Sequence, residues 1–211
     1  EGGLIGFDPW LHTVGQLETL RGELDGSGIE MRATANLIDR IWSDQPAPPM
    51  AIARIHPLEF AGESHGAKRA RLAAELAAAG QNAAIITLPD SLCWLLNIRG
   101  SDIPRNPIAQ GFAVLHQDGT VDLFMAEEKL VEVGDHLGAE VTCRAPESFL
   151  DFLGNLQGPV RIDKATVPVI VAEHLGDRAV WGSDPCALPK ARKNDAEIAG
   201  AAAAHLRDGA A

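Results

Sequence analysis

Hydrophobic positions along the chain recur at two spacings, which predict helices interleaved with short strands. Residues 65–79 place Leu72 and Leu76 on one helical face, with Ser64 as a candidate N-cap and Gly80 as the stop. The apolar run at residues 83–87 predicts a buried strand. Helices that alternate with such strands indicate an α/β fold, in which helices cover both faces of a mixed sheet.

The alternation continues towards residue 181. Asp90 or Ser91 is expected to cap a short apolar helix. The Asp-Gly pair at residues 118–119 predicts a hairpin between residues 111–115 and 120–124, because this dipeptide suits a tight turn with positive φ. Further helices are expected at residues 126–137, 146–156 and 167–175, and further strands at residues 140–143, 160–163 and 178–181.

Two regions with a different pattern flank this block. Before it, an amphipathic stretch at residues 13–24 and a helical spacing at residues 35–42 precede a proline-rich run at residues 45–49, which is typical of an interdomain linker. After it, Asn194 and Glu197 form a capping-box pattern at the start of a helix. The chain opens without a methionine and closes inside an alanine-rich helical pattern, so we expect a piece of a longer protein.

The charge balance argues against several classes of partner. The 211 residues include 29 acidic and 18 basic side chains, a formal net charge of −11, and such a field repels phosphate backbones and anionic lipid. No apolar run approaches the roughly 20 residues needed to span a bilayer. We therefore expect no nucleic-acid and no membrane partner. Three widely separated cysteines fit a reducing cytoplasm: Cys93, Cys143 and Cys186.

The sequence offers few motifs for catalysis. Its seven histidines show no metal-binding spacing, so no metal site is expected in this chain. Residues 62–66 spell G-x-S-x-G, the nucleophile elbow of serine hydrolases, with Ser64 as the nucleophile. Pro57 makes the preceding segment a poor strand, and a helix cap explains Ser64 more simply. The cap is the favoured interpretation, and a serine hydrolase stays an alternative.

The densest group of polar and aromatic residues lies at positions 90–107. In the simpler interpretation it is a capped helix with a buried Trp94, and Arg99 pairs with Asp102 across the following loop. In the functional interpretation Trp94 forms an aromatic wall, and Arg99 presents its guanidinium to a carboxylate or a peptide backbone. Spacing alone favours the simpler one.

Four segments, in order along the chain, resemble the three-domain Xaa-Pro aminopeptidases of the creatinase/prolidase-like metallopeptidases. They read I-G-F-D-P-W-L-H at residues 5–12, N-L-I-D-R-I-W at 36–42, W-L-L-N-I-R-G-S-D at 94–102 and K-N-D-A-E-I at 193–198. The resemblance implies the end of a first creatinase-like domain and a linker at 1–50, a second such domain at 51–186, and the start of a pita-bread catalytic domain at 187–211. A creatinase or prolidase parent is the related alternative.

The resemblance also implies an activity for the parent protein. Such an enzyme removes the residue before a penultimate proline from peptides in the cytoplasm, as a homodimer, with two divalent metal ions, usually manganese. The family's metal ligands, two aspartates, a histidine and two glutamates, would lie beyond Ala211. This chain alone is therefore expected to be inactive and to bind neither metal. It would frame substrate access and contribute to dimerisation, or act as a stand-alone binding or dimerisation module.

Three substrate-binding residues follow from the resemblance. His205 matches a family histidine that contacts bound peptide, although it shares a helical stripe with Ile198 and Ala202 and could instead be a packed helix residue. Trp94 and Arg99 would frame the substrate groove or hold a domain interface. No catalytic residue is expected within the chain.

Overall fold

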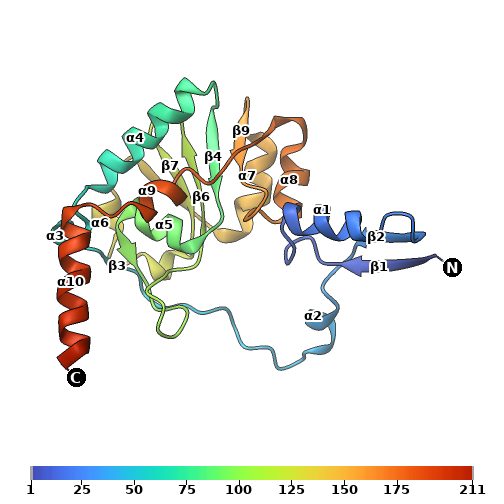
Figure 1. Cartoon of the computed structure of the whole chain (residues 1–211), viewed down its shortest axis with the longest axis horizontal. Helices are drawn as coiled ribbons and strands as arrows, with labels where there is room; N and C mark the ends of the chain where they lie inside the picture. The colour runs from blue at the N-terminus through green and yellow to red at the C-terminus, as the bar shows by residue number, and fades with distance from the viewer. Residues whose placement is uncertain (1, 211) are drawn as a thin grey trace.

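The computed structural model describes residues 2–210 and is built around a six-stranded mixed sheet (Figure 1). The strand order is β10-β9-β4-β6-β7-β8, with antiparallel pairs at β4–β6 and β6–β7 and parallel pairs elsewhere. The strands are β4 (Ala83–Ile86), β6 (Phe112–His116), β7 (Val121–Phe124), β8 (Val141–Arg144), β9 (Val160–Ile162) and β10 (Ala179–Trp181). The expected mixed α/β fold and its central hairpin are confirmed.

Helices cover both faces of this sheet, as predicted. Alternate residues of β4 point to opposite sides: Ile86 packs in the core beneath α4 (His65–Ala78) and α5 (Pro89–Leu96). Ile85 faces the core formed with α7 (Phe149–Asn155) and α8 (Val169–Leu175). All four β4 residues are buried, which explains why the strand reads as a continuous apolar run.

The caps predicted for two helices are present. The Ser64 hydroxyl accepts a hydrogen bond from the Ala67 amide at 3.2 Å. Helix α4 ends at Ala78 with Ala79 as its C-cap, immediately before Gly80, the predicted stop. At α10 (Asp195–Ala210), the Asn194 side chain accepts from the Glu197 amide at 3.0 Å, while the Glu197 carboxylate accepts from the Asn194 amide at 2.9 Å. Both ends of the capping box therefore form.

Three helix predictions need correction. The helix α5 begins at Pro89 with Leu88 at the N-cap, so neither Asp90 nor Ser91 is the cap. Proline suits the first helical position because its φ is already helical and its missing N–H is not needed there. The predicted helix at residues 126–137 is divided into a 3₁₀ turn, η1 (Glu127–Lys129), and α6 (Gly134–Leu137).

The division of residues 126–137 has a tertiary cause. Lys129 is buried and donates to the Asp102 carboxylate at 2.5 Å and to the Gln110 carbonyl at 2.9 Å. Leu130 and Val133 are also buried, so side chains on several sides of the segment are held in the core. Such contacts override helix propensity, and Gly134 disfavours a continuous helix because glycine has a low helix propensity. The helix predicted at 146–156 likewise splits into η2 (Pro146–Ser148) and α7.

The first part of the chain forms a small unit whose strands the sequence analysis did not predict. Strands β1 (Gly3–Phe7) and β2 (Ile29–Ala33) pair in parallel and are joined by α1 (Val14–Glu23). Their residues are mostly exposed, so they lack a strong apolar pattern. Leu17 of α1 and Phe7 pack with Val169 of α8, which attaches the unit to the second face of the sheet.

An extended segment joins this unit to the sheet domain. The short helix α2 (Leu37–Ile41) follows β2, and the proline-rich run after it passes below the sheet to β3 (Arg54–Ile55), as Figure 1 shows. Strand β3 pairs with β5 (Ile98–Arg99). The remaining elements are α3 (Leu58–Ala61), η3 (Gly176–Arg178) and α9 (Ala187–Ala191).

Candidate functional site

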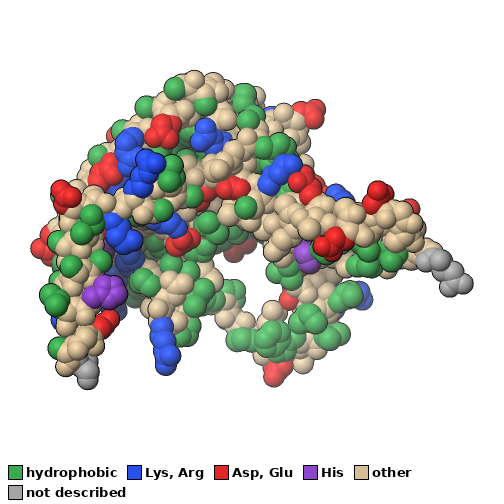
Figure 2. Space-filling model, in the orientation of Figure 1, with side chains coloured by type: hydrophobic (Ala, Val, Ile, Leu, Met, Phe, Trp, Pro, Cys, Tyr) green, Lys and Arg blue, Asp and Glu red, His purple; other side chains and the backbone are tan. Residues whose placement is uncertain are grey.

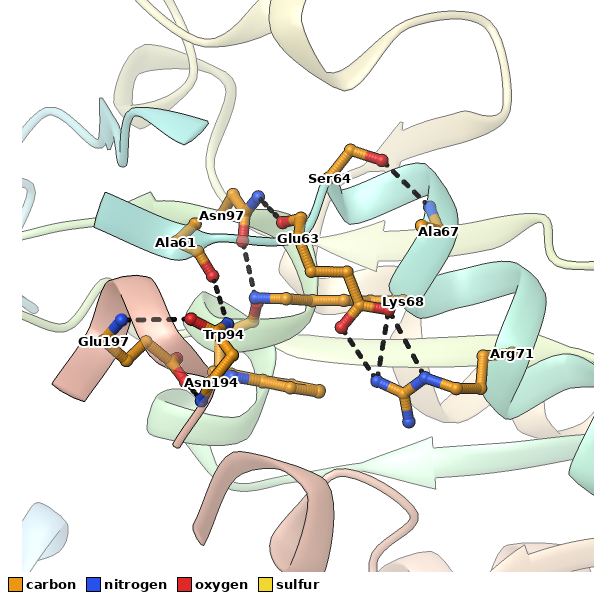
Figure 3. A network of polar contacts seen from close by, with 10 residues as sticks. All are labelled: Ala61, Glu63, Ser64, Ala67, Lys68, Arg71, Trp94, Asn97, Asn194 and Glu197. Atoms are coloured by element: carbon orange, nitrogen blue, oxygen red, sulfur yellow. Dashed lines mark hydrogen bonds and ion pairs between the residues drawn. The ribbon is translucent and has the colours of Figure 1, made fainter. Parts of the chain in front are cut away.

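Helices α3, α4, α5 and α10 meet at one end of the domain, and this junction contains Trp94 (Figure 3) together with Arg99. Trp94 lies near the end of α5 and is 6% exposed. Arg99 follows on β5 and is half-buried. The structure therefore brings two of the three predicted site residues together.

The buried Lys68 of α4 holds the end of α5. Its ammonium donates to the Trp94 carbonyl at 3.0 Å and to the Asn97 side-chain oxygen at 2.8 Å. It also lies 4.2 Å from the centre of the Trp94 ring, a cation–π contact. Burial lowers the pKa of Lys68 to about 8, because charge is disfavoured away from water. Asn97 itself adopts a left-handed conformation, with φ of 52°, and caps the helix.

A second set of contacts fixes the start of α10. The Asn97 amide nitrogen donates to the Glu63 carbonyl at 2.8 Å, and the Asn194 amide nitrogen donates to the Ala61 carbonyl at 2.8 Å (Figure 3). Between these carbonyls, Gly62 has a φ of +69°, and a Cβ there would lie 2.3 Å from the Asn194 oxygen. The turn between α3 and α4 therefore connects α5 to α10, and glycine is required at its centre.

Two cavities flank Trp94. The larger, of about 590 Å³, lies towards β9 and β10 and mixes acidic with basic side chains, including Glu75, Arg161 and Asp184. The smaller, of about 390 Å³, lies between α5 and α10 and contains Arg99. Both volumes fall within the range of small-molecule sites.

Arg99 does not form the ion pair that the simpler interpretation predicted. Its Nη1 donates to the carbonyls of Cys93 at 3.0 Å and Ile98 at 2.7 Å, and no carboxylate of the described residues lies within ion-pair distance. Asp102 pairs with Lys129 instead and accepts from the Gln110 amide at 2.6 Å. Burial lowers the pKa of Arg99. A guanidinium without an acidic partner thus borders the smaller cavity.

His205 lies apart from this pair. It is exposed on α10, the helix that projects from the domain in Figure 1. None of the described residues of α10 is buried, and Ile198 is 54% exposed, so the stripe through Ile198, Ala202 and His205 is not packed within this chain. Gly200 is the last α10 residue to line the smaller cavity.

The geometry at Ser64 does not suit a nucleophile elbow. Helix α3 and a turn precede Ser64, where the motif requires a strand, and the hydroxyl serves as the cap of α4. The neighbouring His65 packs against His136, with ring centres 4.7 Å apart. Burial, followed by the charges of His136 and Arg69, lowers the pKa of His65.

Residues 2–210 contain no group of three or more histidine, cysteine, aspartate or glutamate side chains that could hold a metal ion. No helix in the same range is long and apolar enough to cross a membrane.

Sequence reasoning missed Lys68, although its position carries a signal. Lys68 stands four residues before Leu72 and eight before Leu76, so it lies on the apolar stripe of α4. A lysine at such a position needs acceptors within the core. Asn194 was recognised as a cap, but its bond to Ala61 joins residues far apart in sequence and could not be predicted from local pattern.

A mixed sheet between two helical layers, preceded by a βαβ unit and followed by a projecting helix, describes an α/β domain of the creatinase type. The family model of the creatinase/prolidase N-terminal domain matches residues 44–197. The chain belongs to this family, which confirms the resemblance seen in its motifs.

Similar proteins extend this result over the whole chain. A probable Xaa-Pro aminopeptidase P of Aspergillus clavatus is 35% identical over 229 aligned residues, which cover 100% of this chain and 34% of that protein. A protein of the same description from Aspergillus niger is 34% identical, with coverage of 100% and 37%. The chain therefore spans about a third of the length of these relatives.

A solved structure has the same arrangement. The crystal structure of X-prolyl aminopeptidase from Caenorhabditis elegans superposes with a TM-score of 0.90 at 28% identity, over 99% of this chain and 36% of that one. That protein is described as a cytosolic enzyme with a di-nuclear active site.

Proposed function

We propose that the chain is the noncatalytic portion of a Xaa-Pro aminopeptidase, an enzyme that removes the N-terminal residue preceding proline from peptides. The supporting observation is the alignment of the entire chain with such proteins at 34–35% identity, together with the fold shared with the Caenorhabditis elegans enzyme. Within that enzyme, the chain would narrow the path by which a peptide reaches the metal centre.

The proposal divides the chain into three parts. Residues 1–50 are the end of a first creatinase-like domain with its linker, residues 51–186 are the second such domain, and residues 187–211 begin the catalytic domain. The separate two-stranded unit of β1 and β2 supports the first boundary. The projection of α10 away from the sheet supports the last (Figure 1).

The metal centre would lie outside the described residues, since these contain no suitable ligand cluster. We propose two divalent ions, in line with the di-nuclear active site described for the solved relative, and manganese as the metal that the resemblance of the motifs implies. Such a pair activates a water molecule and polarises the scissile carbonyl. Trp94, Arg99 and His205 contribute to binding the peptide, and the enzyme works in the cytosol.

The experiment compares this chain with the complete protein that carries it. Loaded with manganese, the complete protein should release the first residue of Ala-Pro-Leu and leave Ala-Ala-Leu intact. The 211-residue chain under the same conditions should release nothing. Release of alanine from Ala-Pro-Leu by the chain alone, or its absence with the complete metal-loaded protein, would contradict the proposal.

A role in dimerisation is supported by one surface. Hydrophobic side chains gather over α2 on the face shown in Figure 2. Leu37, Ile38 and Ile41 are 58%, 55% and 77% exposed, an unusual density for five residues of helix. We propose that the complete protein is a homodimer, and that the chain alone is a binding module without activity. Sedimentation of the complete protein should then show a dimer, and Ile41→Glu should weaken that dimer.

A further inference from the structure

We propose that the cavity between α5 and α10 binds the C-terminal carboxylate of a short peptide, and that Arg99 holds it. This inference rests on the proposed aminopeptidase function, because it names the class of substrate. The cavity measures about 390 Å³, and its walls include His56, Phe60, Trp94, Arg99, Lys193 and Glu197.

The hydrogen bonds of Arg99 leave one side of its guanidinium available. The group has five N–H donors, and its Nη1 is occupied by the carbonyls of Cys93 and Ile98. Among the described residues, neither Nε nor Nη2 donates to an acceptor. These two nitrogens form the fork that binds a carboxylate through two parallel bonds. The bonds at Nη1 fix the plane of the fork in advance.

The charges around the cavity favour an anion. Arg99, Lys190 and Lys193 line it, against Asp90 and Glu197. Asp90 pairs with Lys190, so those two charges cancel, and Arg99 and Lys193 remain against Glu197, which leaves one net positive charge. Burial, followed by the positive charges of Arg99 and Lys68, lowers the pKa of His56 on the same wall. A cationic site of this kind contrasts with the net charge of −11 on the whole chain.

The remaining walls suit the body of a peptide residue. Trp94, Pro107 and Ile108 also line the cavity. Phe60 is 53% exposed, so it offers apolar area that the chain itself does not cover. An apolar C-terminal residue would bury its side chain against these groups while Arg99 binds its carboxylate.

The test is a calorimetric or NMR titration of the 211-residue chain with Ala-Pro-Leu, with Ala-Ala-Leu, and with the C-terminal amide of each. Each acid should bind about tenfold more tightly than its amide, the effect of one charge-assisted bidentate contact. Arg99→Lys should lose this preference, because a lysine lacks the fork. Arg54→Gln is the matched control: Arg54 faces Arg99 across the β3–β5 ladder but does not line the cavity, so the preference should remain.

Equal binding of acid and amide by the unaltered chain would overturn the inference without reference to any variant. So would an acid preference that Arg99→Lys retains. In the complete protein, a carboxylate of the catalytic domain is the alternative occupant of the cavity. Repeating the titration with that protein distinguishes the two occupants. Loss of the acid preference there would mean that the protein's own carboxylate fills the cavity, and would also overturn the inference. Ala-Ala-Leu separates the two proposals: it should show the preference even if the complete protein does not cleave before proline.

Discussion

The ammonium nitrogen of Lys68 lies 4.2 Å from the centre of the Trp94 ring and donates to the carbonyl of the same tryptophan at 3.0 Å. One buried cation thus contacts both the side chain and the backbone of a residue that lines two cavities. Lys68 also binds the Asn97 side chain, which in turn holds the turn before α4. The arrangement makes α4 the support on which the candidate site depends.

Replacing this lysine should destabilise the domain. Lys68→Met keeps most of the side-chain volume but leaves the Trp94 carbonyl and the Asn97 oxygen without their donor, which costs about 2 kcal/mol. Urea unfolding measures the loss. The control is Lys164→Met, at a lysine that also lies over a tryptophan ring but is 39% exposed, where we expect less than about 1 kcal/mol. Equal losses for the two variants would contradict a special role for Lys68.

The same lysine should make stability depend on pH. The pKa of Lys68 is about 8 in the folded chain, against 10.5 for an ordinary lysine, so between these values the unfolded chain binds more protons. Stability therefore rises with pH from about 8 to about 10.5, by at most about 1.4 kcal/mol per pH unit. The buried thiols Cys93 and Cys186 act in the opposite sense, because burial raises their pKa.

The contribution of Lys68 is isolated by subtraction. The difference in unfolding free energy between the unaltered chain and Lys68→Met should increase as pH rises over this window. A difference that stays constant from pH 7 to pH 10.5 would show that Lys68 has an ordinary pKa in the folded state.

Gly62 should tolerate no side chain. Gly62→Ala places a Cβ against the Asn194 side chain and adds the strain of a positive φ, so we expect a loss of about 2–3 kcal/mol. Gly80→Ala is the matched control, because Gly80 has a φ of +67° but nothing within 4 Å of the added Cβ. Its loss should be about 1 kcal/mol. Hydrogen exchange should show that only Gly62→Ala loosens the first turn of α10.

The buried ion pair between Asp102 and Lys129 should matter more than an exposed one. Asp102→Asn leaves a buried ammonium without its counter-charge, a loss of about 3 kcal/mol in unfolding free energy. Glu18→Gln removes the carboxylate from the exposed pair with Lys164 and should change stability by less than about 0.5 kcal/mol. If both changes have the same small effect, the Asp102 pair does not organise the loop after β5.

The sequence predicted those features that depend on neighbouring residues. The caps at Ser64 and Asn194 and the Asp-Gly turn of the hairpin each involve residues at most a few positions apart. Features set by distant partners were predicted wrongly or not at all. Arg99 was expected to pair with Asp102, but Asp102 is bound by Lys129, 27 positions along the chain. The exposed strands β1 and β2 pair with each other although α1 separates them in sequence, and the residues of β1 show no alternation of hydrophobic and polar positions.

The candidate site divides in the same way. Motifs selected Trp94 and Arg99, and the structure places both beside one cavity. Lys68 and Asn97, which position them, were missed because their contacts bring α4 and α5 together in three dimensions. The role of all three predicted site residues in peptide binding stays a prediction.

That role is tested most directly by the kinetics of the complete metal-loaded protein on Ala-Pro-Leu. Trp94→Leu should raise KM about fivefold and leave kcat within about twofold, because the role proposed for Trp94 is to bind the peptide and not to take part in its hydrolysis. Trp181→Leu is the control, since Trp181 is 47% exposed on β10 and lines neither of the cavities beside Trp94. A KM that Trp94→Leu leaves unchanged would contradict the account that this chain frames the substrate.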